Sequence, residues 1–246
     1  MRSACQAAAG ILHAVAARVA PGVTTRELDA LAGDMMRQLG GESPFFGYKG
    51  YPGQICVSVN EEVVHGIPGS RRIQYGDLVS LDIGIILNGY VGDNATTVAV
   101  GAVDGRAQAL LQVTEAALVA GVAAARAGHR VGDISAAIQQ AVESHGCTVV
   151  REFVGHGVGR KMHEEPQIPN FGTPRTGPKL KAGMTLAIEP MVNAGTSEVQ
   201  LLKDGWTVVT ADGAPSAHFE HTVLITEGEP EILTWLRKSQ FASKAP

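Results

Sequence analysis

The sequence is poor in cysteine and aromatic residues, and its charges are not clustered by sign. The three cysteines, Cys5, Cys56 and Cys147, are an odd number without CxxC spacing, which argues against a disulfide framework and a thiolate zinc site. No more than two basic residues are adjacent, and 20 Lys and Arg against 24 Asp and Glu give a net charge of −4, so nucleic acid is not expected as the main partner. Free thiols favour a reducing compartment, and we predict a cytoplasmic protein.

The sequence also lacks a long hydrophobic run. Gln6, His13 and Arg18 interrupt the apolar N-terminal segment, which has the periodicity of a helix and not the pattern of a signal peptide. No segment approaches the roughly 18 apolar residues of a membrane span, so no membrane partner is expected. With 246 residues, 45% of them hydrophobic, the chain is long enough to bury a core in one large or two-lobed unit.

The sequence predicts two helices followed by several strands, and the same order of elements then occurs a second time. Thr24 and Glu27 form a capping-box pattern at the second helix, and Asp133 is predicted to cap the fourth. A loop rich in proline and glycine is expected at 166–178. We predict an α+β fold with two similar halves, about 1–101 and 102–246, and with strands at 55–60, 77–87, 90–100, 147–154, 184–190, 206–210 and 218–226.

Asn88 and Gly89 predict a tight hairpin that brings two aspartates together. A two-residue turn at these positions places Gly84 opposite Asp93, and Asp82 then lies on the same face of the sheet as Asp93. The two carboxylates become diagonal neighbours about 7–8 Å apart, with no side chain at Gly84 between them. On the hairpin alone, a cation site and a solvated polar face both remain open as interpretations.

Two further carboxylates lie in apolar strand segments, Glu189 at the end of one and Glu220 within another. Four buried carboxylates repel one another, and two divalent cations offset their charge. Oxygen donors with one imidazole suit Mn²⁺, Fe²⁺, Co²⁺ or Zn²⁺. We expect the imidazole from His65, His156 or His163, which lie in loops flanked by glycine or acidic residues. The other five are explained by their positions. His13 lies off the apolar stripe of its helix, and His129 and His145 lie near helix C-termini. His218 and His221 flank Glu220, as residues of its strand or as residues that support the ligands.

Five longer motifs carry a resemblance to a known family. They are GYKGYPGQICVSVNEEVVHGIP, LDIGIILNGYVGDNATT, REFVGHGVGRKMHEEPQIPNFG, TLAIEPMVN and GWTVVTADGAPSAHFEHTVLIT. In content, order and spacing they resemble the bacterial type I methionine aminopeptidases, which are pita-bread metallopeptidases, and the resemblance covers about residues 2–226. It implies a pita-bread fold, with helices packed on a curved, mainly antiparallel sheet, as a single catalytic domain over residues 1–246.

The resemblance also implies the ligands of a dinuclear metal centre. Asp93 and Glu220 match the bridging positions, Asp82 completes one ion, and His156 with Glu189 completes the other. The cofactors implied are two divalent ions, with manganese, iron, cobalt and zinc all admissible.

The remaining matched positions concern the substrate. His65 and His163 match the histidines that contact the substrate near its first residue and at the scissile carbonyl, and Glu189 is implied as a proton shuttle. At Gly84 many relatives carry threonine, so this chain departs from the family there. The implied methionine pocket is lined by Phe45, Tyr48, Tyr51, Cys56, Met162 and Trp206, of which Phe45 and Met162 also depart from the common residue types.

The implied activity is removal of the initiator methionine from nascent polypeptides by a metal-activated hydroxide. The implied partners are nascent polypeptide N-termini, with a possible transient ribosome contact, and the protein is expected to be a monomer. One alternative is an Xaa-Pro peptidase of the aminopeptidase P or prolidase type, although these relatives usually carry a large additional N-terminal domain. The other is a non-catalytic pita-bread paralogue that binds a partner, which disagrees with the presence of all five ligands.

Overall fold

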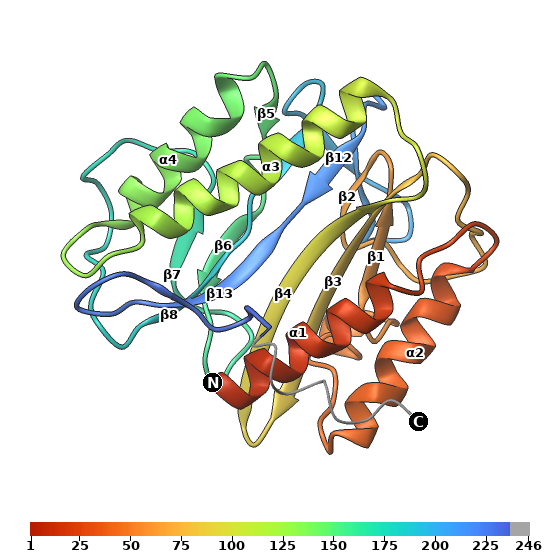
Figure 1. Ribbon diagram of the computed structural model, residues 1–246, viewed down its shortest axis with the longest axis horizontal. Coiled ribbons are helices and arrows are strands. Elements are labelled where there is room, and N and C mark those ends of the chain that lie inside the picture. The colour runs from red at the N-terminus through yellow and green to blue at the C-terminus, as the bar shows by residue number, and fades with distance from the viewer. Residues whose placement is uncertain (237–246) are drawn as a thin grey trace.

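The computed structural model describes residues 1–236, and the tail segment that follows lies outside the described residues. Two helix pairs lie on one face of a curved sheet (Figure 1). The first half contains α1 (Arg2–Ala16), α2 (Thr25–Gln38), the 3-10 turn η1 (Tyr48–Gly50), β1 (Cys56–Val59), β2 (Glu62–Val64), β3 (Leu78–Leu87) and β4 (Tyr90–Ala99). The second half contains α3 (Gly105–Ala124), α4 (Val131–Glu143), β5 (Thr148–Val149), β6 (Val154–Gly157), β7 (Glu164–Pro169), β8 (Thr185–Ile188), β9 (Met191–Asn193), β10 (Val199–Leu201), β11 (Val208–Thr210), β12 (Ser216–His218), β13 (Glu220–Leu224) and β14 (Glu231–Ile232).

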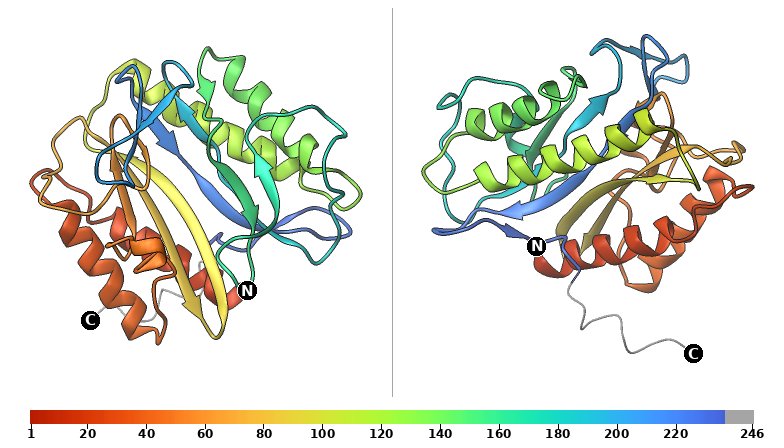
Figure 2. Two further views of the ribbon diagram at one scale, coloured as in Figure 1. Left: turned by 180° about the vertical axis from the view of Figure 1, so that it is seen from behind. Right: turned by 45° about the horizontal axis from the view of Figure 1, so that its top comes forward.

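One large antiparallel sheet joins the two halves. Its strands follow the order β1-β3-β4-β13-β8-β6-β7, and β14 pairs with β13 at one side. Of two further three-stranded sheets, β10-β11-β2 joins a strand of the first half to two of the second, and β12-β9-β5 lies within the second half. Seen from behind, the strands lie in front of the helices, so all four helices share one face of the large sheet (Figure 2). The α+β prediction with two similar halves is confirmed in this arrangement.

Each helix pair builds its own hydrophobic core against the sheet. In the first half, buried side chains of α1 and α2 such as Ile11 and Leu28 pack on Leu81 and Ile83 of β3. In the second half, residues of α3 and α4 such as Leu110 and Ile138 pack on β8 and β13. These two cores lie on the helix-covered face, and the other face of the large sheet is not covered by these helices.

Helix α3 differs from one expectation of the sequence analysis. By length and composition alone, Gly105–Ala124 is apolar enough to cross a membrane. The sequence analysis expected no segment of this kind. Leu110, Ala117 and Leu118 of this helix are buried in the second core. A helix that packs between a second helix and a sheet also needs apolar residues on most of its surface, so length and composition alone do not distinguish it from a membrane span.

Local signals predicted several element boundaries and missed others. The Thr24–Glu27 capping box and the Asn88–Gly89 turn, with both residues at positive φ, are present as predicted. The predicted cap Asp133 is wrong: α4 begins at Val131, and the Asp133 carboxylate accepts a hydrogen bond from the backbone N–H of Arg130, which is the capping residue. The predicted loop at 166–178 begins inside β7, because three ladder pairs with β6 override the prolines.

Candidate metal centre

The carboxylates predicted to bind metal lie in one patch at the middle of the large sheet. Ala95 of β4 pairs with Asp82 of β3 on one side and with Glu220 of β13 on the other. Asp93 lies two residues before Ala95, so its side chain points to the same face. Gly84 pairs with Asp93, as the two-residue turn predicted. The hairpin and the junction of the two halves therefore bring three carboxylates together.

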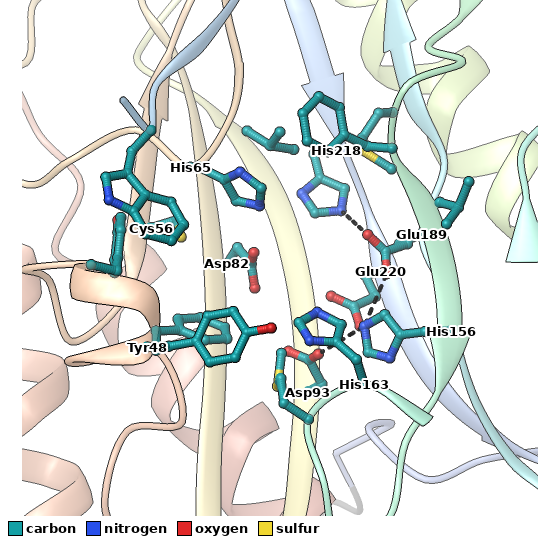
Figure 3. A pocket seen from close by; sticks show the side chains of 18 of the residues that line it. Tyr48, Cys56, His65, Asp82, Asp93, His156, His163, Glu189, His218 and Glu220 are labelled. Atoms are coloured by element: carbon teal, nitrogen blue, oxygen red, sulfur yellow. Dashed lines mark ion pairs between the residues drawn. The ribbon is translucent and has the colours of Figure 1, made fainter. Parts of the chain in front are cut away.

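The second half adds an imidazole and a fourth carboxylate from neighbouring strands. His156 lies within β6 and not in the loop that the sequence analysis expected, and Glu189 directly follows β8. The Nε2 atom of His156 lies 3.8 Å from Oδ2 of Asp93 and 3.4 Å from Oε1 of Glu189. One ligand atom from each of Asp82, Asp93 and Glu220 lies within 4.8 Å of the others. The side chains converge from both sides of the β4–β13 junction (Figure 3).

Burial makes these carboxylates costly to ionise without a counter-charge. It raises the pKa of Asp82 to about 7, and it raises the pKa values of Asp93, Glu189 and Glu220 well above their usual range. Oδ1 of Asp82, Oδ1 of Asp93 and Oε1 of Glu220 are buried without a hydrogen-bond partner within residues 1–236. Divalent metal ions bind such carboxylate oxygens, and they supply the partner and the counter-charge that the oxygens lack. The residues present therefore fit a divalent metal centre.

A cavity of about 340 Å³ opens beside the carboxylates. Its apolar end is formed by Phe45, Tyr51 and Cys56, against which Met162 and Trp206 pack. The Tyr51 hydroxyl donates towards two backbone carbonyl oxygens, that of Ile55 at 3.1 Å and that of Gly66 at 3.0 Å. The Tyr51 ring meets the Trp206 ring edge-on, with the ring centroids 5.0 Å apart. This end is thus apolar and held in place by the contacts of Tyr51, which suits it to bind an apolar side chain.

His65 and His163 line the same cavity from two loops. The His65 ring packs edge-on against Phe153, with centroids 5.3 Å apart, and the His163 ring lies 4.5 Å from the ring of His156. Burial lowers the pKa of His65 to about 4, with a smaller contribution from the charge of His163, and burial also lowers the pKa of His163. Both imidazoles are therefore neutral near pH 7 and able to donate one hydrogen bond each.

The cavity contains every residue that the sequence analysis assigned to the site. The cavity is also lined by residues that the sequence analysis did not assign to the site, among them His218, Lys49 and Glu152. His218 lies two residues before Glu220, and alternation along an extended segment was a signal for placing both side chains on one face. Lys49 lies in the turn η1 with φ of 47°, and nothing in the sequence marks this lysine as part of a site.

Gly84 lies next to Pro44 and Phe45. A side-chain carbon built on Gly84 would lie 2.6 Å from Cγ of Pro44 and 3.1 Å from Cε1 of Phe45. Such distances are shorter than van der Waals contact, so a larger residue at 84 requires the segment around Pro44 to move. The bulk of Phe45 and the absence of a side chain at 84 therefore belong together.

Comparisons with known proteins agree with this geometry. Residues 1–227 match the family model described as metallopeptidase family M24. The chain is 55% identical over 216 residues to methionine aminopeptidase 1 of Bacillus subtilis, which covers 88% of this chain and 87% of the relative. The crystal structure of the Thermotoga maritima methionine aminopeptidase superposes with a TM-score of 0.93 at 48% identity, covering 95% of this chain and 94% of that one.

The fold extends to a more distant group. Prolidase from Pyrococcus furiosus matches with a TM-score of 0.77 at 24% identity, covering 96% of this chain but 63% of its own, which shows the shared fold alone. The predicted pita-bread fold is thereby confirmed. Membership of a metallopeptidase family implies a divalent metal cofactor, in agreement with the acidic cluster. With a curved sheet that carries four carboxylates and an imidazole beside an apolar cavity, the chain belongs to metallopeptidase family M24 and, within it, to the bacterial type I methionine aminopeptidases.

Proposed function

We propose that this protein removes the N-terminal methionine from polypeptides whose second residue is small. The observation that carries the proposal is the rigid apolar end of the cavity directly beside the carboxylate cluster. That juxtaposition allows one apolar side chain to be held while the adjoining peptide bond lies at the polar centre. The relatives in Bacillus subtilis and Thermotoga maritima, named as methionine aminopeptidases, support the same activity.

We further propose two divalent ions, with Asp93 and Glu220 shared between them. Asp82 would complete the first site, and His156 with Glu189 the second, which uses every orphan carboxylate oxygen of the cluster. Bound divalent metal supplies a water nucleophile that ionises near neutral pH and polarisation of the scissile carbonyl. Manganese, iron, cobalt and zinc all suit this donor set.

The side chains around the cluster orient the substrate and move its protons. His163, as a neutral imidazole, donates a hydrogen bond to the scissile carbonyl oxygen and stabilises the charge that develops there. The Glu189 carboxylate takes the proton of the attacking water and delivers it to the departing amine nitrogen. His65, between Phe153 and Trp206, contacts the substrate near its methionine residue.

The apolar pocket sets a graded preference for methionine. A slot of this kind discriminates one methylene group by only about 1–3 kcal/mol, so norleucine should be accepted and shorter side chains progressively less. Phe45, Tyr51 and Cys56 form the apolar end that the methionine side chain would contact.

The wider setting of the reaction is part of the same proposal. Nascent polypeptide N-termini are the proposed substrates in the cytoplasm, with the enzyme acting as a monomer and touching the ribosome transiently. Lys49 and Glu152 are exposed charged residues of the cavity lining, and a longer substrate would contact them.

The experiment that tests the activity compares three peptides with the metal-loaded protein. Met-Ala-Ser should be cleaved to methionine and Ala-Ser, and an N-acetylated Met-Ala-Ser should be resistant because the substrate amine must be free. An Xaa-Pro peptide such as Ala-Pro should be cleaved far more slowly. Faster cleavage of the Xaa-Pro peptide would replace the proposal with prolidase-type activity, and no cleavage of any of the three would favour a non-catalytic paralogue.

A further inference from the structure

His218 is a buried histidine whose polar ring atom has no partner, although it borders the candidate metal centre. Its backbone is fixed by Thr97: the His218 N–H donates to Oγ1 of Thr97, and that hydroxyl donates to the His218 carbonyl oxygen, both at 2.9 Å. The ring lines the cavity, and its Nε2 atom is buried without a hydrogen bond to any described residue. A buried polar atom held this firmly calls for a functional explanation.

The carboxylate of Glu189 lies between two imidazoles, one at each oxygen. Oε1 is 3.4 Å from Nε2 of His156, and Oε2 is 3.8 Å from Nε2 of His218 (Figure 3). His156 also approaches Asp93, at 3.8 Å, whereas Glu189 is the one carboxylate within 4.0 Å of the His218 ring in the described chain. Oε1 therefore faces the carboxylate cluster, and Oε2 faces away from it towards His218.

We propose that His218 is a positioning residue that holds Glu189 by donating its Nε2–H to Oε2. The inference rests on the proposed function, in which Glu189 binds metal and moves a proton. The 3.8 Å separation exceeds hydrogen-bonding distance, and such contacts shorten when an active site binds its ligands. With Oε2 held, the carboxylate keeps Oε1 turned to the metal and cannot rotate away from the departing amine.

His221, on the other side of Glu220, shows that this role is specific to one face of the sheet. Its Nδ1 atom lies 2.9 Å from Oγ1 of Thr234, so the ring is already engaged away from the cavity. His221 is also absent from the cavity lining. The two histidines that flank Glu220 thus form a natural pair for comparison, one facing the centre and one facing the helices.

The test replaces His218 by two side chains of nearly equal length, one with an N–H donor and one without. His218→Met removes the donor, and we expect its affinity for Co²⁺, measured by calorimetry on the metal-free protein, to fall about 10- to 100-fold. His218→Gln retains an N–H, and its Co²⁺ affinity should stay close to that of the wild type. At saturating Co²⁺, kcat for Met-Ala-Ser should fall in the Met variant and recover in the Gln variant, with KM unchanged in both.

The control is His221→Gln, which should bind Co²⁺ as the wild type does, and thermal unfolding of each metal-free variant checks that the fold is retained. A His218→Met protein with wild-type Co²⁺ affinity would overturn the inference. Equal weakening in the Met and Gln variants would also overturn it, because the donor would then not be the decisive group. A wild-type protein that binds Co²⁺ but leaves Met-Ala-Ser intact would instead contradict the proposed function, and the calorimetric comparison would still decide the role of His218.

Discussion

At the scale of single residues, the centre is defined by carboxylates whose surroundings favour the neutral form. Asp93, Glu189 and Glu220 have pKa values raised well above the usual range by burial, with a further contribution from the charge of neighbouring carboxylates, Asp82 in each case. Such groups cluster at functional sites because the energy that opposes their ionisation is recovered when a ligand cation binds. The protein therefore keeps the metal-free centre in an unfavourable state.

Asp82 gives this cost a measurable pH dependence. Burial raises its pKa from 3.8 to about 7 in the folded metal-free protein. The folded state then binds the proton more tightly than the unfolded state, so the contribution of Asp82 to stability is full below about pH 4 and is lost as the pH rises towards 7. Asn has nearly the same shape and does not titrate.

We therefore expect metal-free Asp82→Asn to gain stability over the wild type as the pH rises from 4 to 7. The gain is about 1.4 kcal/mol for each pH unit at most, and denaturant unfolding in the presence of a chelator measures it. Saturating Mn²⁺ should reverse the sign, because the variant lacks a ligand. A stability difference that does not change with pH in the chelated protein would show that Asp82 is ionised throughout.

Glu189 carries the prediction with the largest effect on activity. In Glu189→Gln the side chain keeps its length but loses the basic oxygen, and we expect kcat to fall at least about 100-fold, as for loss of a general acid or base. The circular dichroism spectrum should match that of the wild type. A variant that retains nearly the full rate with Met-Ala-Ser would exclude Glu189 as the proton shuttle.

At the scale of elements, the position of the metal ligands depends on how closely α1 approaches the sheet. A side-chain carbon on Gly92 of β4 would lie 2.3 Å from the backbone carbonyl of Ala4, so only glycine allows α1 to pack at this depth. Gly92 directly precedes Asp93. The position of α1 on the sheet therefore affects the direction in which the Asp93 side chain points.

Gly92→Ala should destabilise the protein by about 1–3 kcal/mol and weaken metal binding, because α1 and β4 must separate. Gly105→Ala is the matched control: a side-chain carbon at this first residue of α3 meets nothing within 4 Å. It should leave both unfolding and metal affinity unchanged. Equal effects of the two substitutions in thermal unfolding would contradict the proposed contact.

Elements also show where prediction from the sequence succeeds. The register of β3 and β4 could be predicted because a two-residue turn at Asn88 and Gly89 fixes every pair of the hairpin, including Gly84 with Asp93. The helix cap at Thr24 could be predicted because it involves four consecutive residues. The contact of His218 with Glu189 could not, because it depends on how β12 pairs with β9, where His218 lies opposite Met191.

At the scale of the whole molecule, the metal centre lies across the junction between the halves. Asp82 and Asp93 belong to the first half, and His156, Glu189 and Glu220 belong to the second. The direct ladder at this junction is short: Glu220 pairs with Ala95 and His221 with Asn94. The ladder is supported by the Thr222 hydroxyl, which donates to the Asp93 carbonyl oxygen at 2.7 Å. Ions bound by ligands of both halves would act as a cross-link across this seam between the halves.

Removal of the metal should abolish cleavage of Met-Ala-Ser, and Mn²⁺, Fe²⁺ or Co²⁺ should restore it. Thorough chelation that leaves the rate unaffected would exclude a metal-dependent reaction. Metal at 100 times its Kd should also stabilise the folded state by about 2.7 kcal/mol, since it binds the folded form alone.

Because the centre is shared, this stabilisation should reach both halves together. Hydrogen exchange followed by mass spectrometry, with and without Mn²⁺, should show slower exchange in peptides from β3 and β4 and equally in peptides from β6, β8 and β13. The helices α2 and α4, which contribute no ligand, serve as internal references and should change only as far as global unfolding does. Protection confined to one half would mean that its ligands alone hold the metal, and the dinuclear centre across the seam would have to be abandoned.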